Sequence, residues 1–190
     1  MRRIGPAAAS VVVSGGAADD ALIERARAGR AGAYDELYRR HRDRVARTAY
    51  LLIRDADAAQ DIVQDAFLIG WRDLHRLRRP EQFRAWVTGI ALNLCRRRRR
   101  AAARDRSRSD KAEPAGSQVD AADAVALRMV VRRAVDALPR PMREAVVLRF
   151  YCGFAESEIS VALGVPVGTV KSRLGRARAR LAEALREVDR

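Results

Sequence analysis

Arginine is the residue type that gives this sequence its binding chemistry. Five consecutive arginines, Arg96–Arg100, follow directly after the apolar segment FRAWVTGIALNLC. Only Lys111 and Lys171 are lysine, so 36 of the 38 basic residues are arginine. A planar guanidinium donates paired hydrogen bonds to a phosphate or to a guanine edge. These residues therefore predict a protein that binds a polyanion.

The position of the positive charge narrows the kind of partner. The 190-residue chain has a formal net charge of +14 and a sequence pI near 11.2. Residues 72–108 contain 13 arginines against 3 acidic residues and so hold +10 of this excess, whereas residues 19–71 are close to neutral. A positive charge concentrated in one block is typical of proteins that bind nucleic acid.

Other reactive residue types are scattered. Cys95 and Cys152 are far apart and lack the spacing of metal ligands, and His41 and His75 are isolated. We find no nucleophile–base pair, phosphate-binding loop or metal-ligand cluster, so we expect no enzyme activity, no cofactor and no metal. The cysteine usage fits a reducing cytoplasm. No apolar run approaches the length of a bilayer-spanning helix, so we also expect no membrane insertion.

The elements that position the arginines are predicted to be helices. Apolar residues recur at three- and four-residue steps, and no segment shows sustained alternation with period two. In the segment before the arginine run, the stripe consists of Phe83, Trp86, Val87, Ile90, Ala91 and Leu94. We expect further helices at about 19–30 and 33–54, from 55 or 57 to 74, from 119 or 124 to 138, and at 142–151. The predicted fold class is all-α.

Composition divides the chain into two small helical domains. Residues 101–118 are rich in Ala, Arg, Ser and Asp, contain Pro114 and Gly116, and offer almost nothing to bury. We therefore predict a flexible tail at 1–18, a first domain at 19–100, a flexible linker at 101–118 and a second domain at 119–190. Each domain is expected to have a core of its own.

The segment ESEISVALGVPVGTVKSRL, residues 156–174, follows the plan of a helix-turn-helix. Gly164 allows a tight turn, and Pro166 stands where the next helix begins and its missing N–H costs little. Small Ser160 is expected to let the two helices cross closely. The outward side of the second helix carries Thr169, Lys171, Ser172, Arg173 and Arg176. These side chains suit the major groove of DNA better than they suit a helical hairpin that merely has a basic face.

Two motifs in this order resemble the extracytoplasmic-function (group IV) sigma factors of bacterial RNA polymerase. The segments DAAQDIVQDAFLIGWRDL and FRAWVTGIALNLCRRRRR are similar to their promoter-melting domain, region 2. The segment LPRPMREAVVLRFYCGFAESEISVALGVPVGTVKSRLGRARARL is similar to their C-terminal domain, region 4. The resemblance covers about residues 19–186 apart from the linker. It implies an alternative sigma factor that binds core RNA polymerase and directs promoter recognition and transcription initiation in a stress or envelope response.

The resemblance also implies a role for each surface. The loop 75–81 should hold a base flipped out of the minus-ten element. Binding to the clamp helices of the largest polymerase subunit is implied for Asp57, Asp61, Gln64, Asp65 and Leu68. Contact with duplex or melted minus-ten DNA is implied for His75, Arg76, Arg78, Arg79, Arg84, Thr88, Asn93, Arg96 and Arg97. Contact with the minus-thirty-five element is implied for Thr169, Lys171, Ser172, Arg173 and Arg176.

Two other functions account for parts of the sequence. A stand-alone helix-turn-helix transcriptional regulator needs a receiver domain, which is usually α/β, and the N-terminal half shows no strands. A basic structural or RNA-binding protein would explain the arginine block but not the acidic third helix or the ordered C-terminal motif. Sigma factors of this class are usually held inactive by an anti-sigma factor, which is a candidate partner that no residue identifies.

Overall fold

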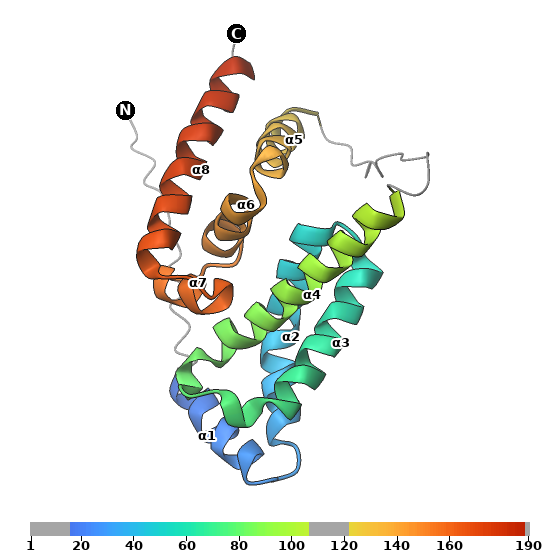
Figure 1. The fold of residues 1–190 in the computed structure, drawn as a ribbon, viewed down its shortest axis with the longest axis vertical. Helices are drawn as coiled ribbons and strands as arrows, with labels where there is room; N and C mark the ends of the chain where they lie inside the picture. Colours follow the sequence, from blue (N-terminus) through green and yellow to red (C-terminus); the bar gives the residue numbers. More distant parts are fainter. Residues whose placement is uncertain (1–15, 107–121, 189–190) are drawn as a thin grey trace, which may run out of the picture.

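The structure, a computed structural model, describes residues 16–106 and 122–188, and most of the expected tail and linker lies outside these ranges. The helices are α1 (Gly16–Arg27), α2 (Ala33–Ile53), α3 (Ala56–Arg72), α4 (Phe83–Arg106), α5 (Ala122–Ala137), α6 (Arg140–Val146), α7 (Glu156–Leu163) and α8 (Val167–Val188). Two 3₁₀ turns, Leu74–Arg76 and Pro80–Gln82, join α3 to α4, and a π-helical turn, Val147–Tyr151, follows α6. The described residues contain no strand, which confirms the all-α prediction (Figure 1).

The first four helices pack around one apolar core. Phe83, at the start of α4, is completely buried, and the rings of Tyr34, Phe67 and Trp86 lie within 6.4 Å of its ring, centroid to centroid. Val87 continues the buried stripe along α4. The predicted apolar stripe of α4 is confirmed, and it anchors the helix that carries the arginine run.

Side-chain hydrogen bonds fix how these helices begin and meet. The carboxylate of Asp55 accepts the backbone N–H of Ala58 at 2.9 Å, which caps the N-terminus of α3. On the other side of the core, the imidazole Nε2 of His41 lies 2.7 Å from Asp19 Oδ2, and both side chains are buried. This pair joins α1 to α2. His41 therefore has a structural position.

The second core combines the C-terminal helices with residues of the first domain. Leu148, Phe154 and Ile159 are at its centre, and Ala85 and Leu92 of α4 are buried in the same cluster. In Figure 1, α7 lies against α4, while α8 runs beside α5 and α6. We expected each domain to have a core of its own. The structure differs because α4 buries a second face. This face consists mostly of small residues, and the pattern of the main apolar stripe did not indicate it.

Two helices end at other residues than predicted. α4 continues through Arg106, six residues past the predicted end of the first domain, because Ala101–Ala103 are strong helix formers. The helix expected at about 142–151 is instead the short α6 followed by the π-helical turn. The turn ends before Gly153, which has a φ of 69°.

Candidate protein and nucleic-acid interfaces

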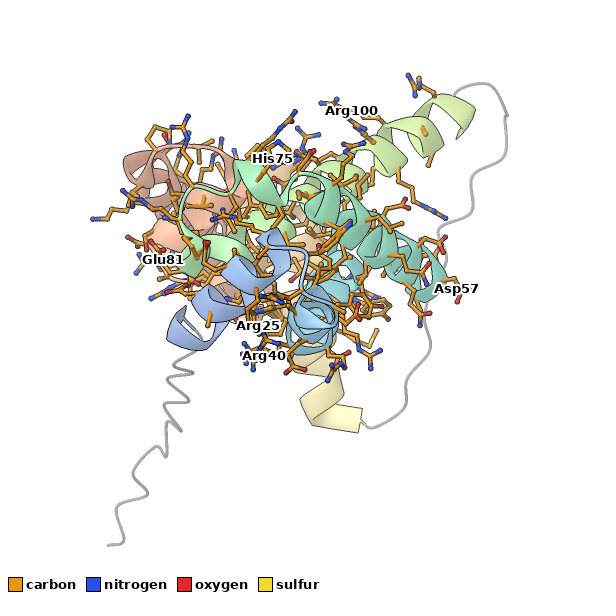
Figure 2. All side chains as sticks on the ribbon, turned by 90° about the horizontal axis from the view of Figure 1, so that it is seen from below. Arg25, Arg40, Asp57, His75, Glu81 and Arg100 are labelled. Carbon is orange, nitrogen blue, oxygen red and sulfur yellow. The ribbon has the colours of Figure 1, made fainter. Side chains whose placement is uncertain are left out.

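One side of α3 presents a polar stripe to solvent. The five residues predicted to bind polymerase are all exposed and form what we call the acidic stripe: Asp57, Asp61, Gln64, Asp65 and Leu68. Figure 2 shows Asp57 at the margin of the molecule, in the first turn of α3, where the helix dipole favours a carboxylate. The opposite side of α3, including Ile62 and Phe67, is buried in the first core. The stripe is therefore available to a partner without any loss of core packing.

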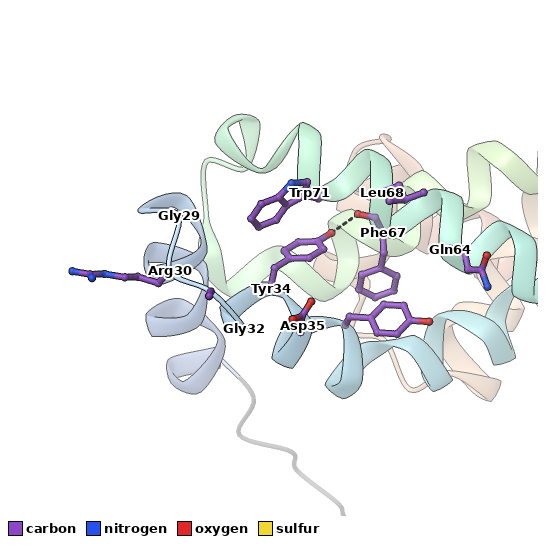
Figure 3. A pocket seen from close by; sticks show the side chains of 11 residues that line it. Gly29, Arg30, Gly32, Tyr34, Asp35, Gln64, Phe67, Leu68 and Trp71 are labelled. Carbon is purple, nitrogen blue, oxygen red and sulfur yellow. Dashed lines mark hydrogen bonds between the residues drawn. The ribbon is translucent and has the colours of Figure 1, made fainter.

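An aromatic hollow adjoins the acidic stripe (Figure 3). It encloses about 790 Å³, and its walls include Tyr34, Tyr38, Phe67, Leu68 and Trp71. The Tyr34 hydroxyl donates to the backbone carbonyl of Phe67 at 2.6 Å, and its ring meets that of Trp71 at a centroid distance of 4.9 Å. Burial raises the pKa of the Tyr34 phenol. The hydroxyl is thus a fixed donor in the wall of the hollow.

Two large apolar side chains remain exposed at the rim of this hollow. Leu68 is 67% exposed and Trp71 is 49% exposed. Exposed apolar groups that lie beside a polar rim are typical of protein interaction sites. Sequence reasoning identified Leu68 but missed Trp71. The spacing could have identified Trp71. Leu68 lies four residues after Gln64 and Trp71 lies three residues after Leu68, which puts all three on the same side of α3.

The loop between α3 and α4 is anchored by apolar residues and by one arginine. Leu74 and Leu77 are buried, and the Arg27 guanidinium of α1 donates to both of their backbone carbonyls. The predicted DNA-binding residues of the loop are exposed: His75, Arg76, Arg78 and Arg79. A second hollow, of about 600 Å³, lies between α1 and this loop and is lined in part by Arg72 and His75. The structure therefore presents the loop cations on a fixed backbone.

The predicted DNA-binding residues of α4 fall into two groups. Asn93 and Arg97 are exposed. Arg84 and Arg96 instead reach the C-terminal domain. Arg84 pairs with Glu158 at 2.5 Å, and Arg96 pairs with Glu144 at 2.7 Å. Thr88 is 1% exposed, and its hydroxyl donates to the backbone carbonyl of Arg84 at 2.7 Å. In this arrangement of the domains, Thr88 is not accessible to DNA.

The helix-turn-helix has the predicted turn but a different role for Ser160. Gly164 ends α7 with a φ of 66°, a left-handed conformation that glycine adopts without strain. The carbonyl of Pro166 accepts the N–H groups of Thr169 and Val170, which starts α8. The Ser160 hydroxyl donates to the carbonyl of Val165 at 2.6 Å. Ser160 therefore closes the turn, in addition to being small enough for a close crossing.

The outward face of α8 carries the residues predicted to contact the minus-thirty-five element. Lys171, Ser172 and Arg176 are exposed, and Thr169 and Arg173 are half-buried. The Arg176 guanidinium donates to the Ser172 hydroxyl at 3.0 Å, so the two side chains share one patch. The inward positions Val170, Leu174 and Ala177 pack into the second core. The face of α8 that carries the basic residues is thus free to enter a groove.

Within residues 16–106 and 122–188, no group of three or more His, Cys, Asp or Glu side chains could hold a metal ion. No helix in the same ranges is long and apolar enough to cross a membrane.

Comparison with known families matches both halves of the chain. Residues 37–105 match the family described as Sigma-70 region 2, and residues 128–181 match Sigma-70, region 4. The first match covers the acidic stripe, the loop and α4. The second covers the helix-turn-helix. A stand-alone regulator with a receiver domain would not contain region 2, so this alternative is excluded.

Individual relatives extend the match over nearly the whole chain. The ECF RNA polymerase sigma factor SigM of Mycobacterium tuberculosis is 36% identical over 173 residues, which cover 88% of this chain and 84% of SigM. Among solved structures, CnrH in complex with the cytosolic domain of CnrY has a TM-score of 0.66 and 31% identity, with 91% of this chain and 99% of CnrH covered. RpoE of Bartonella quintana, in complex with the anti-sigma factor NepR, has a TM-score of 0.66 and 27% identity, with 83% and 98% covered. With both sigma regions present in order on one all-α chain, the protein belongs to the ECF RNA polymerase sigma factors.

Proposed function

We propose that this sigma factor uses three separate surfaces to bind core RNA polymerase and the two promoter elements. The observation that supports the proposal is that three surfaces of different chemistry lie on different parts of one fold. The acidic stripe lies on α3, the loop cations lie between α3 and α4, and the basic face of α8 belongs to the other domain. The chain supplies recognition in transcription initiation, in a stress or envelope response, and leaves the nucleotide chemistry to the polymerase.

The acidic stripe and the aromatic hollow are the proposed surface for the clamp helices of the largest polymerase subunit. The carboxylates Asp57, Asp61 and Asp65 would pair with basic residues of the partner. Leu68 and Trp71 supply exposed apolar area beside these carboxylates, and large apolar side chains often carry much of the binding energy of an interface. Charge would set the orientation of the complex, and the apolar pair would supply most of its affinity.

The loop between α3 and α4 is the proposed site for a flipped base of the minus-ten element. Taking a base out of the stack costs a few kcal/mol, which a pocket and nearby cations must offset. The hollow lined by Arg72 and His75 is large enough for a base, and Arg76, Arg78 and Arg79 surround the loop with positive charge. Along α4, the exposed Asn93 and Arg97 extend this surface.

The outward face of α8 is the proposed reader of the minus-thirty-five element. Arg176 and Lys171 are placed to donate to guanine edges or phosphates in the major groove, and Ser172 supports Arg176 from the same patch. We propose that the remaining arginines of α8, Arg178 and Arg180, contact phosphates or solvent, because one helix cannot direct all of them into one groove.

Control by an anti-sigma factor is proposed by analogy with two of the matched structures. CnrH was solved with the cytosolic domain of CnrY, and RpoE with the anti-sigma factor NepR. A partner of this kind would cover the same surfaces as polymerase and DNA. We also propose that the protein acts in the cytoplasm, where chromosomal promoters and core polymerase are found.

The polymerase surface is tested by charge reversal on α3. The double variant Asp61→Arg, Asp65→Arg should lose most of its ability to displace a labelled reference sigma factor from core polymerase. Its helical circular dichroism should stay that of the parent, because both side chains are exposed. Glu183→Arg, at an exposed position on α8, is a control for charge reversal away from α3 and should compete like the parent. Undiminished competition by the double variant would remove α3 from the interface.

A further inference from the structure

Three arginines from three helices meet at one acidic residue, Asp136 of α5. The Arg54 guanidinium, at the C-terminal end of α2, donates to both carboxylate oxygens of Asp136, at 3.2 and 3.4 Å. The Arg143 guanidinium, from α6, donates to the backbone carbonyl of Asp136 at 2.8 Å. The Nε atom of Arg132, one turn earlier on α5, lies 4.0 Å from the Asp136 carboxylate. Positive charge from both domains thus gathers around a single carboxylate.

Arg99 of α4 brings a fourth guanidinium to the same place. It donates to the backbone carbonyl of Leu52 at 3.1 Å, two residues before Arg54. Burial and the positive charge of Arg99 lower the pKa of Arg143, so these two guanidinium groups are close enough to repel each other. We call Arg54, Arg99, Arg132 and Arg143 the arginine cluster.

The acidic residues do not balance the charge of the arginine cluster. Among the described residues, Asp136 is the one carboxylate that pairs with the cluster, so four positive charges face one negative charge. Glu144 also lies close to Arg143, but its two carboxylate oxygens already accept hydrogen bonds from Arg96, at 3.0 and 2.7 Å. Charges that are partly removed from water require counter-ions. The cluster therefore has room for a further anion.

Two donors of the arginine cluster are buried and unused. The Nε–H groups of Arg54 and Arg143 are shielded from solvent and have no hydrogen-bond partner in the part of the chain that the structure describes. Buried polar groups are nearly always hydrogen-bonded, so two such donors on converging side chains indicate an acceptor that binds between them. The side chains of Arg54 and Asp136 are 27% and 39% exposed, which leaves a way in from solvent.

The chemistry of the arginine cluster selects the class of this acceptor. The planar guanidinium group binds phosphate oxygens through paired N–H donors. An excess of three positive charges favours a multivalent anion over a single carboxylate. The oxygens of a phosphate group point in several directions, so one group can accept from donors that approach from different helices.

We propose that the arginine cluster binds a small phosphorylated anion, whose phosphate oxygens accept hydrogen bonds from Arg54 and Arg143. None of the four residues of the cluster belongs to the three surfaces of the proposed function, so the proposal does not depend on that function. Arg54 belongs to the first domain and Arg143 to the second, and one bound anion would contact both. An anion that binds the folded chain and not the unfolded chain also stabilises the fold by mass action.

Isothermal titration calorimetry of the full chain with sodium pyrophosphate tests this site. Sodium chloride is adjusted to keep the ionic strength constant, so that the screening of surface charge does not change during the titration. The parent should bind one pyrophosphate per chain. Arg54→Gln and Arg143→Gln should each weaken binding about tenfold, because each removes one charged donor. Arg25→Gln, at an exposed position on α1, removes the same charge away from the cluster and should bind like the parent.

A variant with the opposite effect keeps the test independent of folding defects. Asp136→Asn removes the carboxylate that competes with phosphate for Arg54, and it should tighten pyrophosphate binding several-fold. Loss of structure would not produce tighter binding. Asp43→Asn, at a position on α2 whose side chain is 86% exposed, is the matched control and should leave the affinity unchanged. All variants are checked by circular dichroism.

A second titration, with a short duplex DNA of random sequence, distinguishes a free phosphorylated anion from the phosphates of a DNA backbone. Saturable pyrophosphate binding that weakens in Arg54→Gln and Arg143→Gln and tightens in Asp136→Asn would support the proposal. Absence of saturable binding by the parent, or one affinity shared by the parent and these three variants, would overturn it. Variants of the cluster that weaken DNA binding and leave pyrophosphate binding unchanged would also overturn it, because the cluster would then serve DNA.

Discussion

The pairing of Arg96 with Glu144 leads to a prediction that distinguishes two adjacent arginines. Arg96 and Arg97 follow each other on α4, and the resemblance assigned both to DNA. The structure separates them, because Arg96 binds both oxygens of a carboxylate that is 4% exposed, whereas Arg97 is exposed. Arg96→Ala should therefore reduce both stability and DNA binding, and Arg97→Ala should reduce DNA binding only.

The size of the stability loss follows from what remains around Glu144. Removing one partner of a buried ion pair costs about 3–5 kcal/mol, because the other charge stays buried and unpaired. Here Arg96 is partly exposed, and the Arg140 guanidinium stays 3.7 Å from Glu144. We therefore expect the free energy of unfolding to fall by about 2 kcal/mol in Arg96→Ala. For a chain of this length, that loss lowers Tm by about 4–8 °C.

Urea unfolding followed by circular dichroism measures this difference. Arg97→Ala should stay within about 0.5 kcal/mol of the parent, as is usual for an exposed substitution. A double-mutant cycle with Glu144→Ala should give a coupling energy of about 1 kcal/mol or more. Equal stabilities of Arg96→Ala and Arg97→Ala, or a coupling energy near zero, would refute the assignment of Arg96 to the interface between the domains.

Three further predictions concern capping, thiol chemistry and DNA reading. Asp55→Ala should lower the free energy of unfolding by about 1 kcal/mol in urea titration, because it removes the cap of α3, whereas Asp55→Asn should keep most of the stability. Burial raises the pKa of Cys95 to about 12, so its thiol stays protonated and alkylation of the native protein should stay slow from neutral to mildly alkaline pH. Mass spectrometry that detected rapid native labelling of Cys95 would contradict this burial. Arg176→Ala should cost roughly 1–3 kcal/mol of promoter discrimination in competition binding, and an equal loss on every DNA sequence would exclude base reading.

The features that could be predicted from sequence are those that depend on local chemistry. The stripe through Phe83 and Val87 predicted the buried side of α4, because periodicity reports one face of a helix. Gly164 and Pro166 marked the turn of the helix-turn-helix for reasons of backbone geometry. The residues of the acidic stripe were identified by the resemblance to sigma factors, and the structure shows that all of them are exposed on α3.

The features that could not be predicted depend on residues far apart in the chain. Ala85, Thr88 and Gly89 are small, and nothing in their spacing indicates that another domain covers them. Arg84 meets Glu158, which is 74 positions away, and no local pattern reveals such a pair. The resemblance to sigma factors assigned these arginines to DNA, which describes the bound state, whereas the structure describes the chain without a partner.

The most direct test of the central claim is in vitro transcription with purified bacterial core RNA polymerase. Templates would be genomic fragments together with the region upstream of the gene for this protein. The account predicts start sites that appear only when the chain is added and that share a two-part upstream motif. Transcription that is the same with and without the chain, on every template, would contradict it.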